Sequence, residues 1–197
     1  MNDHAPRRKA AEEASHADTT LSMPLSVEHL APLSLVRMRD GNPDDMLALN
    51  AMMLASPSHK LLTQGRLPSA HEGEMLFESL PAGAVREDKF LWCAWQQQRL
   101  VGCIEVIRHW PVKDAAYIGF LQVAEALHRR GLGMQILKTA RQNMRSWRGV
   151  RRLRLAVAEN NPGALAFWRQ AGFRDIGQRD RQAEFTAPLI VMERPLS

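Results

Sequence analysis

The chain has 197 residues, enough for one domain, and its composition excludes several classes of protein. Hydrophobic residues make up 45% and charged residues 24%, which is typical of a chain that folds around a core in water. Every apolar run is shorter than the ~18 residues that span a bilayer, so we expect no membrane partner and a cytoplasmic protein. Arg7 and Arg8 do not open a twin-arginine export signal, because a polar stretch follows them.

The two cysteines and the net charge of +5 narrow the range of partners. Cys93 and Cys103 are too few for a disulfide framework or a structural zinc site, and we expect reduced, half-buried thiols that lie near each other across a hairpin. Six arginines carry much of the positive charge: Arg141, Arg145, Arg148, Arg151, Arg152 and Arg154. Nucleic acid is a possible partner but not the favoured one, because no RNA-binding motif with interleaved aromatic residues accompanies them.

The first part of the chain predicts a tail followed by a strand and a helix. Residues 1–30 are polar and show no sustained periodicity, so we expect a flexible tail in front of one domain over residues 31–197. Alternating apolar residues predict a strand over residues 33–38. Asn42 followed by proline and two aspartates predicts the start of a helix that ends near Ala55.

Residues 56–68 are punctuated by Pro, Ser and Gly and predict a loop or a broken helix. Exposed loops often shape binding surfaces, although an ordinary solvated loop has the same composition. Its candidate substrate contacts are His59, Lys60, Gln64 and Arg66. The run from Ser69 to Glu72 predicts a capping box that opens a second helix, which ends at Leu80.

The rest of the chain alternates strands and helices. Three strands are predicted as an antiparallel meander over residues 89–96, 99–110 and 115–123. They are followed by a helix from about Arg130 to Trp147, a strand over residues 150–157, a helix over residues 162–171 and closing strands over residues 173–179 and 185–193. Asn161 and Gly172 supply the caps of the later helix. This order predicts a mixed α/β fold with one central sheet.

The connection between the third strand of the meander and the next helix predicts an anion site. Gly131 and Gly133 allow close backbone approach, and the start of a helix offers unpaired N–H groups with partial positive charge. Arg129 and Arg130 add donors suited to phosphate. The spacing matches neither a P-loop nor the dinucleotide fingerprint, because Lys138 and Ile136 stand at the wrong places for those motifs.

Two motifs together resemble the GNAT superfamily of N-acetyltransferases. The first is R/Q-x-x-G-x-G/A, read here as His128 to Gly133, and the second is N-x-x-A-x-x-F-W-x-x-x-G-F, read as Asn161 to Phe173. Further stretches, such as the strand G-C-I-E-V-I-R-H-W-P, are similar to a bacterial branch whose substrate is unassigned. The resemblance implies a mostly antiparallel, twisted sheet of about six or seven strands, splayed between strands four and five and flanked by about four helices.

The resemblance also implies a function. A member of this superfamily transfers an acetyl group from acetyl-CoA, as cosubstrate and without a metal, to a primary amine of a small molecule, a peptide or an aminoacyl group. A monomer or a homodimer is expected. The residues that the resemblance assigns to coenzyme A are Leu121, Gln122, Val123, His128, Arg129, Arg130, Gly131, Leu132, Gly133, Met134, Asn161, Ala164, Phe167 and Trp168.

Two positions depart from the superfamily pattern. His128 replaces the usual Gln or Arg, which matters little because the phosphate contacts are mostly from the backbone. Trp168 replaces the tyrosine that is taken to protonate the departing thiolate, and an indole N–H is not a useful acid. A catalytically silent module that binds acyl-CoA or associates with nucleic acid is therefore the alternative.

We expect the general base to lie on the strands beside the expected thioester. The candidates are Glu105, Tyr117, His109 and Asp114. A tight turn before Ala115 would pair Glu105 near Phe120 and Tyr117 near Arg108. Glu105 is the first choice, because a carboxylate among apolar strand residues has its pKa raised toward neutrality, and Tyr117 is the second.

Overall fold

The computed structural model describes residues 32–39 and 42–196. The expected flexible tail over residues 1–30 lies outside these residues. Among the helices in the described part of the chain, none combines the length and the apolar character that a membrane span requires.

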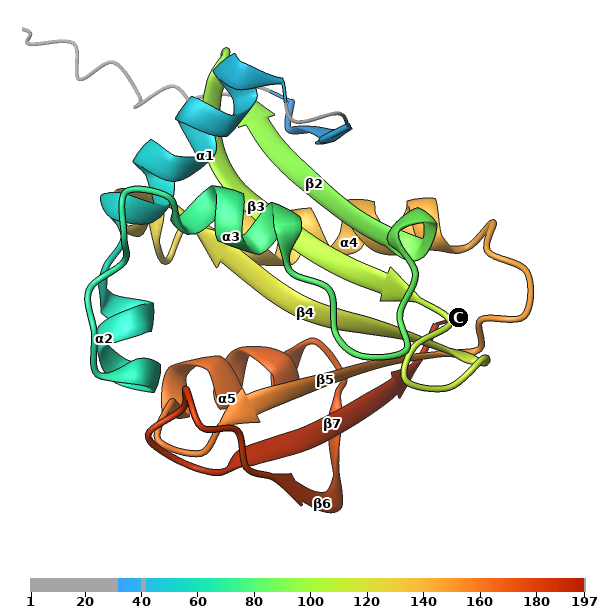
Figure 1. The fold of residues 1–197 in the computed structure, drawn as a ribbon. Coiled ribbons are helices and arrows are strands. Elements are labelled where there is room, and N and C mark those ends of the chain that lie inside the picture. Colours follow the sequence, from blue (N-terminus) through green and yellow to red (C-terminus); the bar gives the residue numbers. More distant parts are fainter. Residues whose placement is uncertain (1–31, 40–41, 197) are drawn as a thin grey trace, which may run out of the picture. The chain divides into compact units, whose positions relative to one another are not determined.

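The described strands form one seven-stranded sheet in the order β1-β2-β3-β4-β5-β7-β6 (Figure 1). The strands are β1 (Ser34–Arg37), β2 (Lys89–Gln96), β3 (Arg99–Arg108), β4 (Ala115–Val123), β5 (Arg152–Ala158), β6 (Arg174–Asp180) and β7 (Leu189–Pro195). All neighbouring pairs are antiparallel except β4 and β5, which are parallel. The predicted mixed α/β class with a mostly antiparallel sheet is confirmed.

Five α-helices and two short 3-10 turns connect the strands within the described residues. They are α1 (Pro43–Leu54), α2 (Ser58–Gln64), α3 (Glu72–Glu78), η1 (Arg86–Asp88), η2 (Glu125–Leu127), α4 (Leu132–Met144) and α5 (Pro162–Gln170). The expected number was about four; residues 56–68, predicted as a loop or a broken helix, contain the additional short helix α2. Figure 1 shows α1 and α3 in front of the sheet and α4 behind it.

Each face of the sheet has its own hydrophobic core. On the α4 side, strand residues such as Ile104 pack with Ile136 of α4 and Leu165 of α5. On the α1 side, Leu49 packs with Leu91 of β2. Because side chains alternate along a strand, Ile104 and Val106 of β3 enter the first core and Cys103 faces α1, whereas the register shift near Val101 reverses this order at the start of β3.

Cys93 and Cys103 are direct cross-strand neighbours in the β2–β3 register, as predicted. The prediction that they are half-buried is wrong: Cys93 is 2% exposed and Cys103 is fully buried, because α1 covers this face of the sheet. Burial raises the pKa of Cys93 to about 12 and that of Cys103 well above its usual value. Both are free thiols that stay protonated at neutral pH.

The last strand begins later than predicted. The sequence pattern indicated a strand from residue 185, whereas β7 starts at Leu189. Thr186 instead donates its backbone N–H to the C=O of Thr63 in α2, at 2.9 Å. The segment between β6 and β7 therefore pairs with a helix rather than with the sheet.

A buried carboxylate joins α2 to α3. Glu72, of which 3% is exposed, accepts hydrogen bonds from both Nη atoms of Arg66 and from the N–H of Ser69, each at 3.0 Å, and Lys60 Nζ lies 2.5 Å away. The Ser69 bond is half of the predicted capping box. Burial by itself raises the pKa of Glu72, but the bonds from Arg66, Lys60 and Ser69 outweigh it and lower the pKa to about 2.

We expect Glu72→Gln to lower the free energy of unfolding at pH 7 by about 1–3 kcal/mol, because the buried side chain loses its charge-assisted bonds to Lys60 and to the partly exposed Arg66. The folded pKa lies below the ordinary 4.5, so the stabilisation is complete above about pH 4.5 and is lost as the pH falls toward 2. Urea denaturation at pH 7 and below pH 3 measures both effects, with the exposed Glu184→Gln as control. Equal stability of variant and wild type at pH 7 contradicts this role.

Candidate functional site

The parallel strands β4 and β5 separate after a short paired stretch. Ala115–Ile118 of β4 pair with β5, which then continues beside β7 alone. Beyond this stretch the β3–β4 register shifts, so Gly119 is an extra residue on β4, a β-bulge of the kind that bends a strand. The second half of β4 therefore has an edge that faces an opening, which confirms the predicted splay between strands four and five.

This open edge carries unpaired backbone groups. The N–H of Ala124 donates to the C=O of Val101 at 2.9 Å, so Leu121 and Val123 direct their N–H and C=O groups away from β3 and toward the opening. Gln122 points to the α1 side, where its Nε2 donates to the C=O of Ser56 at 3.0 Å.

The side chain of His128 binds one of the backbone groups on this edge. Its Nε2 lies 3.0 Å from the C=O of Val123, so the ring is bound to the end of β4 rather than directed at a phosphate. Leu121 keeps both its N–H and its C=O free of partners among the described residues. Leu121 is thus the better placed of the two residues to pair with an extended ligand.

The loop before α4 gathers backbone donors. Arg129 and Gly131 both have left-handed conformations, with φ of 65° and 77°, which turns neighbouring N–H groups toward one side. None of the N–H groups from Arg129 to Met134 donates to another group in the described part of the chain. The side chains of Arg129 and Arg130 are exposed beside them. This arrangement suits a pyrophosphate.

The far wall of the opening comes from α5. A Cβ on Gly133 would lie 3.3 Å from Phe167, so glycine at this place lets α4 approach that ring closely. Asn161 caps α5 by accepting the N–H of Ala164 at 3.0 Å. Trp168 is 8% exposed and packs edge-on against Phe167 and Phe173, so its ring belongs to the core.

Glu105 lies across the strand from Phe120, as the sequence predicted. Its carboxylate covers the bulge and occupies the space where a side chain of Gly119 would stand. Lys89 Nζ lies 2.9 Å from Glu105 Oε1, and both side chains are almost fully buried. Burial raises the pKa of Glu105, and the positive charge of Lys89 partly opposes this effect.

Lys89 was not anticipated from the sequence. Besides Glu105, its ammonium donates to the C=O of Leu76 at 2.6 Å and to the C=O of Ser79, both at the end of α3. The one signal in the sequence is a lysine at the start of an otherwise apolar strand, K-F-L-W.

Tyr117 is one residue out of its predicted register, because it pairs with Ile107 rather than Arg108. The bulge at Gly119 causes the difference. Its ring packs edge-on against Trp110. Burial raises the pKa of Tyr117 to about 12, and the charge of Asp180 adds to the increase.

The structure separates the other two base candidates from the opening. His109 Nδ1 contacts the C=O of Lys113 at 2.6 Å, and Asp114 is paired with Arg152 at 3.1 Å. Both lie at the turn between β3 and β4, at the opposite end of β4 from the loop that precedes α4. Neither is brought together with Glu105.

Comparison with known proteins identifies the family. The model of the acetyltransferase (GNAT) family matches residues 59–173, more than half of the chain. The chain belongs to the GNAT family. It is therefore an acetyltransferase in the general sense, and the family signature includes the loop before α4 and the whole of α5.

Solved structures agree with this assignment. An acetyltransferase from Thermus thermophilus is 26% identical, with a TM-score of 0.66 over 85% of this chain and 99% of that one. The ribosomal-protein-S18-alanine N-acetyltransferase from Escherichia coli is 18% identical (TM-score 0.60, 84% and 95% covered). An aminoglycoside acetyltransferase in complex with coenzyme A is 15% identical (TM-score 0.63, 83% and 95% covered). The last two show the fold alone, and a comparison with curated proteins found no significant match.

In this GNAT chain α2 bridges the two strands that separate. At its start, Ser58 donates its N–H and hydroxyl to Glu125, just after β4, at 3.2 and 2.5 Å. At its end, Asn160, which follows β5, donates to the C=O of Leu62 at 2.9 Å. Of the side chains predicted to contact a substrate, Lys60, Arg66 and Gln64 are tied to Glu72 or to each other. Of these four side chains, only His59 has no hydrogen-bond or ion-pair partner among the described residues.

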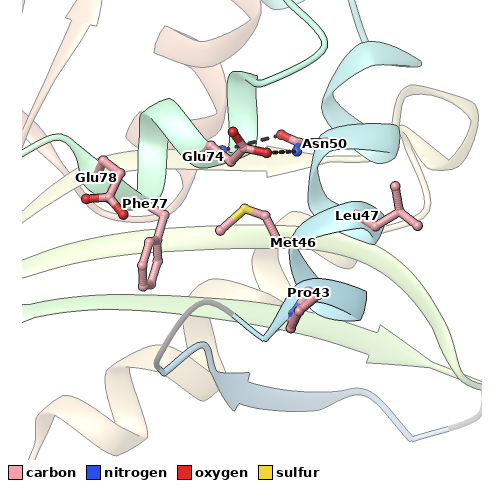
Figure 2. A pocket seen from close by; sticks show the side chains of 7 residues that line it. All are labelled: Pro43, Met46, Leu47, Asn50, Glu74, Phe77 and Glu78. Carbon is pink, nitrogen blue, oxygen red and sulfur yellow. Dashed lines mark hydrogen bonds between the residues drawn. The ribbon is translucent and has the colours of Figure 1, made fainter.

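An open pocket lies elsewhere. It has a volume of about 450 Å³ between α1 and α3, lined by Pro43, Met46, Leu47, Asn50, Glu74, Phe77 and Glu78 (Figure 2). Asn50 Nδ2 donates to Glu74 at 3.1 Å on its wall. Because no residue of the β4–β5 opening lines it, we do not assign the acetyl-transfer site to this cavity. No cluster of potential metal ligands occurs in the described residues.

We expect Lys89→Met to lower the free energy of unfolding by about 3–5 kcal/mol, because it leaves a buried carboxylate unpaired. In a Glu105→Gln background the cost should be smaller, since no charge is left to compensate. Urea denaturation of the wild type, both single variants and the double variant measures this coupling. The exposed Lys113→Met serves as control. Strictly additive losses contradict a direct interaction between the two side chains.

Proposed function

We propose that the domain over residues 31–197 is an N-acetyltransferase that moves an acetyl group from acetyl-CoA to a primary amine by direct attack on the thioester. One observation carries the proposal: beyond the point where β5 leaves β4, the free backbone groups of Leu121 are followed in the chain by the free N–H groups of residues 129–134. The first set suits an amide-containing arm and the second suits a pyrophosphate.

The residues on this border fit coenzyme A. Acetyl-CoA would supply the activated acetyl group as a thioester. The N–H groups from Arg129 to Met134 would hold the pyrophosphate, and Leu121 would pair with the arm. A backbone N–H near Leu121 would also stabilise negative charge on the thioester oxygen, which is a task for preorganised donors. Phe167 and Ala164 would line the opposite wall.

The departing thiolate does not require the missing tyrosine. Trp168 is buried in the core, which supports a mechanism without an acid at that position. A thiol has an ordinary pKa of about 8.5, so its thiolate leaves without protonation. An alkyl amine with a pKa of about 10.4 has to lose a proton first, which costs roughly 4–5 kcal/mol at pH 7. A base therefore contributes more than an acid.

Of the two proposed catalytic residues, Glu105 fits better than Tyr117. Its carboxylate covers the bulge beside the opening, and Lys89 opposes its protonation. Tyr117, with its pKa raised to about 12, stays protonated at neutral pH and is a weak base. We assign Glu105 the role of a fixed negative charge that attracts the ammonium form of the acceptor.

The acceptor is proposed to be an amine of a small molecule, a peptide or an aminoacyl group. The named structural neighbours act on an alanine of a ribosomal protein and on aminoglycosides, so the same fold serves both classes. Release of free thiol from acetyl-CoA, measured with a panel of amines from all three classes, tests the proposal. Binding of coenzyme A without thiol release for any amine would favour the silent acyl-CoA-binding module instead.

Gly133→Ala is expected to weaken coenzyme A binding by about tenfold, equivalent to ~1.4 kcal/mol, because its Cβ would press against Phe167 and narrow the cradle. Gly163→Ala is the matched control, since it also lies in the first turn of a helix and its Cβ finds ordinary space, 3.7 Å from Asn161. Isothermal titration calorimetry with coenzyme A measures both. Equal affinities of the two variants would refute the placement of the cofactor.

A further inference from the structure

The short helix α2 is held rigidly at both ends across the opening. Its first residue is bound to Glu125 by two hydrogen bonds. At the other end, the C=O of Thr63 accepts both the N–H and the hydroxyl of Thr186, at 2.9 and 3.1 Å. These bonds fix both ends of α2 and so the position of the side chains on its inner face.

His59 is the uncommitted polar side chain on this inner face. It is half-buried, and neither ring nitrogen has a hydrogen-bond partner among the residues that the structure describes. The other polar groups of α2 are used: Thr63 Oγ1 donates to the C=O of His59 at 2.8 Å, and Lys60 is bound to Glu72. Neither ring nitrogen is among the buried unpaired polar atoms of the described residues, so both are open to solvent and available to a ligand.

The ring of His59 lies over the catalytic part of β4. It packs edge-on against Phe120 with 5.6 Å between the ring centroids. Phe120 follows the bulge at Gly119 and pairs with Glu105, and its peptide precedes the free backbone groups of Leu121. His59 thus reaches the proposed thioester from the α1 side of the sheet, opposite the wall formed by α5.

The charges around His59 favour its neutral form. Burial lowers its pKa, and the ammonium of Lys60 lowers it further. Other charged groups are engaged: Glu72 of α3 holds Lys60, Glu125 of η2 is bound to Ser58, and Glu105 of β3 is paired with Lys89. The imidazole is therefore mostly unprotonated at pH 7 and able to accept a proton.

We propose that His59 is the general base of acetyl transfer and takes the proton of the acceptor amine. The inference rests on the proposed function and names a residue for the same site. His59 accepts one proton of the acceptor's ammonium, which frees the nitrogen lone pair to bond to the acetyl carbon. The nitrogen releases a second proton to solvent as the amide forms, and the electron pair of the broken carbon–sulfur bond leaves with the thiolate. The proton then passes from His59 to solvent. Glu105, locked by Lys89, keeps its role as a fixed charge.

The first test is the titration of His59 itself, which needs no acetyl-CoA. NMR of protein with ¹³C,¹⁵N-labelled histidine, with the His59 signal identified by its loss in His59→Gln, should give a pKa below 6.5. Lys60→Met removes a nearby positive charge, while Arg66 still binds Glu72, so the His59 pKa should rise. A His59 pKa at or above 6.5 in the wild type overturns the proposal.

The second test is turnover against pH, measured by thiol release with the best amine of the panel. His59→Gln should lower kcat about 100-fold without weakening coenzyme A binding, and the acidic limb of kcat/KM should disappear. In Lys60→Met the same limb should move to higher pH together with the NMR titration. His71→Gln is the matched control, because that histidine is exposed and paired with Glu74.

The outcomes separate this inference from the proposed function. Wild-type turnover in His59→Gln, or an acidic limb that persists there and disappears in Glu105→Gln, overturns the role of His59 while acetyl transfer stands. A wild type that binds coenzyme A but releases no thiol with any amine overturns both. A thermal denaturation midpoint for His59→Gln close to that of the wild type shows that a loss of turnover is not a loss of fold.

Discussion

The separation of β4 from β5 is the constraint on which the rest of the structure depends. Two parallel strands pair over Ala115–Ile118, and then a bulge at Gly119 and the pairing of β5 with β7 draw them apart. A strand edge inside a domain leaves backbone groups that need partners. In the function proposed here the partner is coenzyme A, which would make this irregularity of the sheet the binding site.

Buried ion pairs hold the helices that border this opening on the α1 side. Lys89 joins the end of α3 to Glu105 at the bulge, and Glu72 joins the start of α3 to two cations on and after α2. Such pairs contribute little net stability compared with an apolar core, but a change of one partner is costly. Their main effect here is to fix the positions of α2 and α3 relative to the sheet.

Much of the local structure at the proposed cofactor site was predictable from the sequence, because its parts are neighbours in the chain. A strand, a glycine loop and a helix start follow one another directly, and Asn161 caps the helix next to it in the chain. The cross-strand pairs Cys93–Cys103 and Glu105–Phe120 followed from short turns. The predicted partner of Tyr117 was wrong by one residue. The bulge at Gly119 displaces the strand pairs that lie between it and the β3–β4 turn, and a glycine is the only trace of it in the sequence.

The sequence by itself determined the order of elements and the glycine turn before α4, since turns and helix caps depend on neighbouring residues, and the splay of the sheet followed from the resemblance to the family. Only the tertiary structure decided that Lys89 forms an ion pair with Glu105, that Trp168 belongs to the core and that α2 carries His59 over Phe120. Each of these depends on packing between distant parts of the chain, and α2 is too short to be stable without its bonds to Glu125, Asn160 and Thr186.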